Sequence, residues 1–231
     1  MKIAILSDIH GNDTALKAVL NEARSLNVQR LLVLGDLVGY YYNPDRVLAL
    51  LSQWPKELIR GNHEEILSRA SCDENYLHKI EMKYGKGIKY ALENLSAEQI
   101  AMLISLPNSS RVVVDGLRLE LHHGSPRHSN EYVYPDASLE VLQECASLNT
   151  DFVLMGHTHY PFMFTKDGVT IVNPGSVGQA RDKGGMASWA VLNTANRSIV
   201  FKHTPFDVEV LKDQAMRIDP ECPYLWEVLE R

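Results

Sequence analysis

The first sixty residues alternate between short apolar runs and segments in which apolar residues recur at helical spacing. The apolar runs, each typical of a strand covered on both faces, lie at residues 2–7, 30–34 and 57–59. Asn12 or Asp13 can cap a helix whose inward-facing residues recur through 16–23. Asn43 and Pro44 predict the cap and first turn of a second helix. The order β-α-β-α-β predicts a parallel sheet covered by helices.

From about residue 64 to residue 107 the pattern is helical. Ser96 with Gln99 has the sequence of a capping box, and Pro107 ends the segment. No Gly/Ser-rich linker flanks it, so we expect a helical insertion packed on the same domain. A single domain over residues 1–231 is therefore predicted.

The second half of the chain is rich in β patterns. Two β runs flank Asp115-Gly116, which predicts a hairpin. A helix over 137–148 and a strand over 151–156 are expected next. Three further runs predict successive antiparallel strands, at residues 161–173, 186–193 and 197–206. The tail from Asp207 is expected to be helical, and the fold class is α/β.

Composition narrows the class of protein. Apolar residues make up 45% of the 231 residues and charged residues 23%, as in ordinary globular proteins. The net charge of −6 argues against a basic nucleic-acid-binding face, so no stable nucleic-acid complex is expected. An anionic substrate stays compatible with this charge, because a bound metal reverses the local potential.

Cysteine usage and the N-terminus bear on the compartment. Three cysteines without a CxxC pair are typical of reduced thiols. The apolar start is too short for a signal peptide and is interrupted by Asp8, and no apolar run approaches the length of a membrane span. We expect a cytoplasmic protein without a membrane partner, and the sequence is compatible with a homo-oligomer.

Polar residues follow the predicted strands where they end. Asp8 with His10, and His157 with His159, are pairs spaced two residues apart. Side chains two apart on a strand project to the same side, so each pair could present two ligands together. The carboxyl ends of strands are where ligands bind in open α/β sheets. Ligand-type residues also follow three other predicted strands, namely Asp36 after Gly35, Asn62 after Gly61, and His122-His123 before Gly124.

The residue types at these junctions favour a metal site. They comprise two carboxylates, one amide and at least four histidines without a thiolate, a set that suits Mn²⁺, Fe, Zn²⁺, Co²⁺ or Ni²⁺. These are too many ligands for one ion with an open position, but two ions sharing a carboxylate use them all. Such pairs hold a hydroxide for in-line attack on phosphorus, so we expect a hydrolytic site.

Each junction alone has a simpler interpretation. An isolated D-x-H or H-x-H is usually chance or a surface cluster, and an Asp after a strand is usually a cap or turn residue. Six of the nine histidines nevertheless fall in these few junctions, beside glycine or another ligand-type residue. Capping does not require histidine, so the metal interpretation is preferred.

Five blocks in chain order resemble the calcineurin-like metallophosphoesterases. They are D-x-H at 8–10, G-D at 35–36, G-N-H-E at 61–64, H-G at 123–124 and G-H-x-H at 156–159. NPGSVGQ at 173–179 resembles a segment of the small, mostly prokaryotic phosphodiesterase-like members. The resemblance implies a four-layer α/β/β/α sandwich of two mixed sheets flanked by helices. It also implies two divalent metal ions, Mn²⁺ foremost, with Fe, Zn, Ni or Co as alternatives.

The resemblance assigns roles residue by residue. The first metal would be bound by Asp8, His10, Asp36 and His159, and the second by Asp36, Asn62, His123 and His157, with Asp36 bridging. His123 is preferred to His122 because it directly precedes the glycine. His63 resembles the family's catalytic histidine, and an imidazole near neutral pKa can protonate a leaving alkoxide. The alternative for His63 is a surface histidine near a helix start.

The chain departs from the protein Ser/Thr phosphatases. RGNHE at 60–64 resembles them, but their second block continues into Asp-Arg-Gly, where this chain has GDLVGYYYNP. No Asp stands there to orient His63, which disfavours protein phosphatase activity. The resemblance to dinucleoside polyphosphate hydrolases extends only to the metal blocks.

Candidate substrate contacts are Tyr40, Arg127 and Arg181. Tyr40 follows Asp36 and could stack on a base or aryl group. Either arginine could hold a non-bridging phosphate oxygen. A packing tyrosine and surface arginines are the simpler interpretations.

The sequence thus predicts a dinuclear-metal phosphoesterase acting on small phosphate esters, including nucleotide-type phosphates. The main alternative is a non-catalytic, protein-binding scaffold on the same fold, like the retromer subunit that lacks the catalytic histidine. The retained His63 favours the enzyme. A DNA-repair nuclease is disfavoured by the acidic balance and by the absence of long extra domains.

Overall fold

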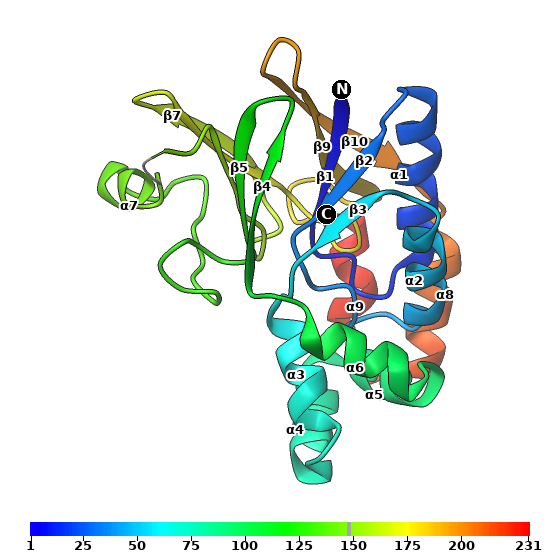
Figure 1. The fold of residues 1–231 in the computed structure, drawn as a ribbon. Coiled ribbons are helices and arrows are strands. Elements are labelled where there is room, and N and C mark those ends of the chain that lie inside the picture. The colour runs from blue at the N-terminus through cyan, green and yellow to red at the C-terminus, as the bar shows by residue number, and fades with distance from the viewer. Residues whose placement is uncertain (147–148) are drawn as a thin grey trace.

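Two five-stranded mixed sheets form the centre of the computed structural model, which describes residues 1–146 and 149–231 (Figure 1). The first sheet has the order β10-β9-β1-β2-β3, with bounds Ser198–Pro205, Met186–Asn193, Lys2–Leu6, Arg30–Val33 and Lys56–Leu58. The second has the order β4-β5-β6-β8-β7, with bounds Ser109–Val114, Leu117–His122, Phe152–Leu154, Val169–Pro174 and Pro161–Lys166. Both sheets are mixed, since β1, β2 and β3 are paired in parallel in the first sheet and β5, β6 and β8 in the second, while the remaining pairs are antiparallel.

Helices cover the outer faces of both sheets. On the first sheet lie α1 and α2, with bounds Asp13–Ser25 and Pro44–Ser52. The buried side chains of α8, Val208–Ile218, pack against the loop after β2 and the C-terminal residues. The second sheet carries α7, Leu139–Glu144, on its far side (Figure 1). Four helices gather at one end of the sandwich, α3 (Asn62–Ala70), α4 (Glu74–Tyr84), α5 (Gly87–Asn94) and α6 (Ala97–Ser105). The chain ends in α9, Tyr224–Glu227, and a 3-10 turn, Val228–Glu230.

The alternation of side chains along β1 explains the layering. Ile3 and Ile5 lie in the core between the two sheets, together with Leu119 of β5. Ala4 and Leu6 point the other way, into the core shared with α1 and with the helices of residues 62–105. The strand is therefore apolar at every position, as a strand buried on both faces requires. The predicted sandwich of two mixed sheets flanked by helices is confirmed.

Several predicted elements are present as expected. The parallel β1-β2-β3 arrangement, the β4–β5 hairpin around Asp115-Gly116 and the helical tail are confirmed. Asn12 caps α1 by accepting from the Ala15 N–H at 2.9 Å, and Ser96 with Gln99 forms the predicted capping box. The predicted helix over 137–148 is shorter, Leu139–Glu144, and the last two predicted residues, 147–148, lie outside the described residues.

Two predictions are wrong. The strands of residues 161–205 are not one antiparallel series, because β8 pairs in parallel with β6 and β9 belongs to the other sheet. Local β pattern does not record which sheet a strand joins. Asn43 precedes α2, but its side chain makes no cap hydrogen bond and donates instead to Asp13 at 2.8 Å. In the described part of the chain, every helix is too short or too polar to cross a bilayer.

Candidate metal centre

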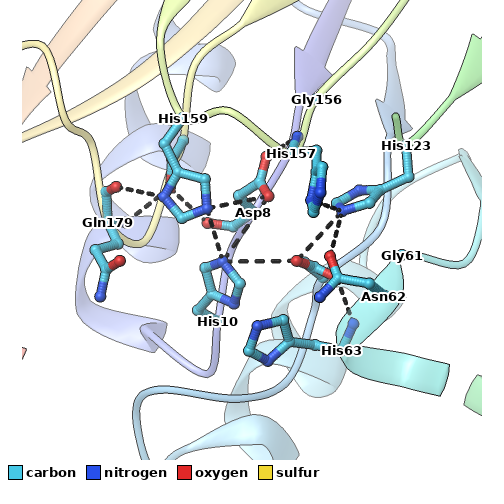
Figure 2. Close-up of polar contacts among 12 residues, drawn as sticks. Asp8, His10, Gly61, Asn62, His63, His123, Gly156, His157, His159 and Gln179 are labelled. Atoms are coloured by element: carbon cyan, nitrogen blue, oxygen red, sulfur yellow. Dashed lines mark hydrogen bonds and ion pairs between the residues drawn. The ribbon is translucent and has the colours of Figure 1, made fainter. Parts of the chain in front are cut away.

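Seven ligand-type side chains converge beyond the carboxyl ends of strands from both sheets (Figure 2). They come from the loops after β1, β2, β5 and β6 and from the first residue of α3, namely Asp8, His10, Asp36, Asn62, His123, His157 and His159. Ligand atoms of three overlapping groups, Asp8/His10/His159, His10/Asp36/His63 and Asp36/His123/His157, lie within 4.8 Å of one another. The structure thus brings together every residue that the sequence proposed as a metal ligand.

The backbone at this cluster is unusual. Asp8, His10, Asp36, His157 and His159 have φ between 52° and 68°. This left-handed region costs a non-glycine residue roughly 1–2 kcal/mol. Because β1 ends at Leu6 and β6 at Leu154, these turns, rather than strand alternation, place each pair of ligands together. Strain concentrated at one place indicates a functional site.

Asp36 stands between the two ends of the cluster. Its Oδ1 accepts a hydrogen bond from the backbone N–H of His63 at 2.8 Å. Its Oδ2 lies 3.8 Å from Nε2 of His10 and 3.3 Å from Nε2 of His123. One oxygen is held by the backbone, so the other is free to serve both groups of ligands.

Asp8 has the same division of its two oxygens. Its Oδ2 accepts from the backbone N–H of His157 at 3.1 Å, while its buried Oδ1 has no hydrogen-bond partner. That oxygen lies 3.3 Å from Nε2 of His159. A buried carboxylate oxygen without a donor is costly unless a cation fills the gap.

Three of the histidines have their tautomer set by the backbone. His10, His123 and His159 place Nδ1 next to a carbonyl oxygen, respectively those of Val38 (3.2 Å), Leu34 (2.7 Å) and Gln179 (2.7 Å). We assign the proton to Nδ1, because a carbonyl only accepts, and this leaves Nε2 facing the cluster. The Nε2 atoms of His10 and His159 are 3.2 Å apart, so two lone pairs face each other. The donor set fits bound cations of the nitrogen- and oxygen-preferring kind.

Electrostatics reinforce the cluster. Burial opposes the charge of Asp36, but His123 and His63 hold the pKa of its carboxyl well below the usual range. Burial likewise opposes the charge of His123, but Asp36 and Asp8 raise the pKa of His123 to about 10. Burial and the neighbouring His123 lower the pKa of His157 to about 4. Without a cation, the positive charge that balances the carboxylates resides on His123.

His63 lies beside the cluster with a buried ring, only 3% exposed, which is not what a surface histidine would show. Its ring centre lies 4.7 Å from that of His10, 5.0 Å from Tyr40 and 5.5 Å from Tyr84. A Cβ on Gly39 would lie 2.0 Å from Nδ1 of His63, so only glycine leaves room for the ring. Aromatic rings and Gly39 therefore orient His63 in place of a carboxylate, and Nδ1 has no hydrogen-bond partner. Burial lowers the pKa of His63.

Glu64 is a supporting residue to which the sequence analysis assigned no role. Its buried carboxylate accepts from the backbone N–H groups of Asp36 (2.9 Å), Leu37 (2.7 Å) and Gly61 (2.8 Å). It thereby joins the loop after β2 to the start of α3. Burial and the charge of Asp36 raise the pKa of Glu64 to about 7. Its position three residues after the helix cap was the available signal.

The NPGSVGQ segment supports the ligand loops from behind. Asn173 donates to the carbonyl oxygen of Gly156 at 2.7 Å, and Ser176 donates to that of Asp8 at 2.7 Å. The carbonyl oxygen of Gln179 accepts a hydrogen bond from Nδ1 of His159, as described above. The segment holds the loops after β1 and β6 against each other.

The candidate substrate contacts are placed differently from one another. Tyr40 is buried and packs edge-on against His10, with ring centres 4.6 Å apart. The backbone N–H of Arg181 donates a hydrogen bond to the carbonyl oxygen of His159 at 3.4 Å. In its side chain, the buried Nε has no hydrogen-bond partner. Arg127 is not brought to the cluster, because its guanidinium pairs with Glu131 and Glu144.

His122 and His123 point to different surroundings. His123 joins the cluster, where its Nε2 lies 3.0 Å from Oδ1 of Asn62 and 3.1 Å from Nδ1 of His157. His122 lies beside Glu120, with Nε2 3.5 Å from a carboxylate oxygen. The geometry agrees with the preference for His123 as the ligand candidate.

Comparison with known proteins identifies the family. The sequence model of the calcineurin-like phosphoesterase superfamily domain matches residues 1–197. The chain belongs to this superfamily. A phosphoesterase relative, phosphodiesterase YfcE of Escherichia coli, is 25% identical over 211 residues, covering 87% of this chain and 91% of the relative. An uncharacterized protein of Methanocaldococcus jannaschii is 30% identical over 226 residues, covering 90% and 88%.

A solved structure agrees with the membership. The metallophosphoesterase of Sphaerobacter thermophilus superposes on this superfamily member with a TM-score of 0.80 and 28% identity, covering 100% of this chain and 98% of the other. The predicted resemblance is thus confirmed. The chain is a phosphoesterase-family protein with candidate metal-binding residues at the junction of its two sheets.

Proposed function

We propose that this protein is a dinuclear-metal phosphoesterase that hydrolyses small phosphate esters. The observation that carries the proposal is Asp36, whose free Oδ2 lies within reach of both ligand groups while its Oδ1 is fixed by a backbone N–H. A carboxylate so placed is suited to bridge two divalent cations. Mn²⁺ is the preferred ion for this mixed histidine and carboxylate set, with Fe, Zn, Ni or Co as alternatives.

Each residue then has a role. Asp8, His10 and His159 would complete the first metal position, and Asn62, His123 and His157 the second. When bound, such a pair supplies Lewis acidity that activates water and neutralises charge on the phosphoryl oxygens.

His63 and Arg181 would act on the substrate itself. His63 would protonate the leaving oxygen; burial lowers the pKa of its ring, so the negative charge of a bound phosphate ester would be needed to favour the protonated imidazolium. Arg181 would hold a non-bridging oxygen through its guanidinium, whose charge acts on Tyr40 beside His10. We propose the cytoplasm as the compartment, which the three free cysteines support.

The alternative is a non-catalytic scaffold on the same fold. A scaffold has no need of a complete ligand set, left-handed turns that aim it, or a buried histidine beside it, and this chain has all three. These features favour the enzyme. Activity on phosphoproteins or dinucleoside polyphosphates has no feature of its own in support.

The test is a hydrolysis panel with metal-free protein reconstituted with Mn²⁺, Zn²⁺, Ni²⁺ or Co²⁺. We expect turnover of bis(p-nitrophenyl) phosphate that EDTA abolishes and Mn²⁺ restores. p-Nitrophenyl phosphate and dinucleoside polyphosphates measured in parallel would rank ester classes. Metal binding without hydrolysis of any ester in the panel would instead support the scaffold.

A further inference from the structure

A cavity of about 360 Å³ opens next to the second ligand group. Asn62 and His157 form part of its lining, and Asn62 is the one partly exposed residue among the seven ligand candidates, all of which the structure describes. A phosphoester bound at the metal positions would therefore extend one of its arms into this cavity. The volume is at the small end of ligand pockets, suited to one flat group and its sugar rather than to a large ligand.

The walls of the cavity favour a flat aromatic group. Tyr132 lines it with a 53% exposed side chain, and its ring lies 3.8 Å from the ring of His157 at an interplanar angle of 31°. Arg69 and Tyr76 line it from α3 and α4, with the guanidinium 4.0 Å from the Tyr76 ring centre. Exposed aromatic and guanidinium planes beside a phosphate site bind nucleobases by stacking.

Of the charged side chains that line the cavity, Glu65 is paired with an arginine, whereas Arg69 is not paired with a carboxylate of any described residue. Glu65 also lines it, but pairs with Arg60 at 3.8 Å and accepts from Asn130 at 3.4 Å. Within the part of the chain that the structure describes, Arg69 has no ion-pair partner. Its N–H donors can therefore bind the carbonyl and ring-nitrogen acceptors of a base.

We propose that this cavity binds the nucleoside of a nucleoside 5′-phosphate ester, with the base stacked on Tyr132 and bonded by Arg69. The proposal rests on the phosphoesterase function above. His63 does not line the cavity, so the nucleoside is the arm that stays on phosphorus, while the leaving group departs on the His63 side. The substrate class is therefore a nucleoside 5′-phosphodiester with a second, separate alcohol.

A binding experiment tests the cavity without turnover. Calorimetry on Mn²⁺-loaded protein would compare the methylenephosphonate analogues of AMP and of ribose 5-phosphate, in which a C–P bond prevents hydrolysis. The two ligands differ only in the base, and we expect the AMP analogue to bind about 10-fold more tightly or better, given about 1–3 kcal/mol for base stacking. Equal binding of the two, including no measurable binding of either, would overturn the proposal.

Variants locate the effect. Tyr132→Ala and Arg69→Met should each reduce the preference for the AMP analogue at least about threefold. Arg46→Met is the matched control, because Arg46 has a 67% exposed side chain on α2 and does not line the cavity. A preference that survives both Tyr132→Ala and Arg69→Met, or that Arg46→Met removes equally, would show that the base binds elsewhere.

A kinetic comparison separates this proposal from the function on which it rests. The p-nitrophenyl ester of thymidine 5′-phosphate and methyl p-nitrophenyl phosphate share a leaving group and differ in the arm that remains. We expect kcat/KM to be about 10-fold or more higher for the nucleotide ester. Hydrolysis of both esters at equal kcat/KM would overturn the cavity proposal alone, whereas base-selective binding without any hydrolysis would overturn the phosphoesterase function alone.

Discussion

The backbone N–H of His63 donates a hydrogen bond to Oδ1 of Asp36 at 2.8 Å. The residue proposed to assist the leaving group thereby also orients the carboxylate proposed to bridge the metals. The imidazole and the N–H are separable, because replacing the side chain leaves the backbone donor in place. Side-chain substitutions can therefore test the two roles independently.

Asp36→Asn removes the charge of the proposed bridge and keeps its size. We expect metal content below that of the unaltered protein and a fall in phosphodiester hydrolysis of about 10²-fold or more, because a neutral amide is a poor bridging ligand. Metal analysis by mass spectrometry and turnover of bis(p-nitrophenyl) phosphate measure the two effects. Asp45→Asn, at an exposed position in the first turn of α2, is the matched control. Unchanged activity in Asp36→Asn would exclude the bridge.

His63→Ala removes the proposed proton donor. We expect kcat to fall about 10²–10⁴-fold, as for loss of a general acid, with metal content near that of the unaltered protein. Because the His63 ring lies in a potential ligand group with His10 and Asp36, loss of metal in this variant would make His63 a ligand instead. His78→Ala, at a side chain 74% exposed, controls for general effects of histidine removal.

Glu64→Gln tests the carboxylate that joins the two ligand loops. A glutamine has one oxygen and cannot accept all the N–H donors that Glu64 serves, so at least one is left unpaired. We expect the free energy of unfolding to fall by about 1–3 kcal/mol in urea titrations, with weaker metal binding. Glu65→Gln, which breaks only the partly exposed ion pair with Arg60, should cost about 1 kcal/mol or less. Equal stabilities of the two variants would contradict the supporting role of Glu64.

Metal binding should release a proton from His123. In the metal-free protein burial disfavours the charged form of His123, but the attraction of Asp36 and Asp8 outweighs it and raises the pKa of His123 to about 10. The ring is therefore protonated at neutral pH. A metal ion must displace that proton, so affinity should rise by up to about tenfold per pH unit below pH 10. Calorimetry in buffers of different ionisation enthalpy counts the protons. Affinity that does not change between pH 6 and 8, with no proton released, would remove His123 from the ligand set.

The polar residues at strand ends were predictable because residue type and position suffice to find them. Asp36 and His123 follow apolar runs, and parallel strands bring such ends to one edge. The turns that aim them were not predictable, since Asp is enriched in the left-handed region but adopts it at only a small fraction of positions, so residue type alone does not predict φ near +55° at Asp8 or Asp36.

Long-range relationships were equally hidden. Glu64 contacts backbone atoms 27 and 28 residues away in the sequence, and Tyr132 reaches His157 from a loop without a periodic pattern. The separation of β8 and β9 into different sheets follows from the packing of the whole sandwich. Each depends on tertiary contacts that no window of local sequence contains.

The candidate ligands are divided between the two layers of the sandwich, since Asp8 and Asp36 follow strands of one sheet and His123 and His157 follow strands of the other. Cations shared among them would fasten the layers at this end as a rivet fastens two plates. Metal occupancy would then affect how firmly the two sheets are held together as well as the chemistry of the site. Removing the ions should leave the hydrophobic core between the two sheets closed, and the sheets should separate first at the end that holds the candidate ligands.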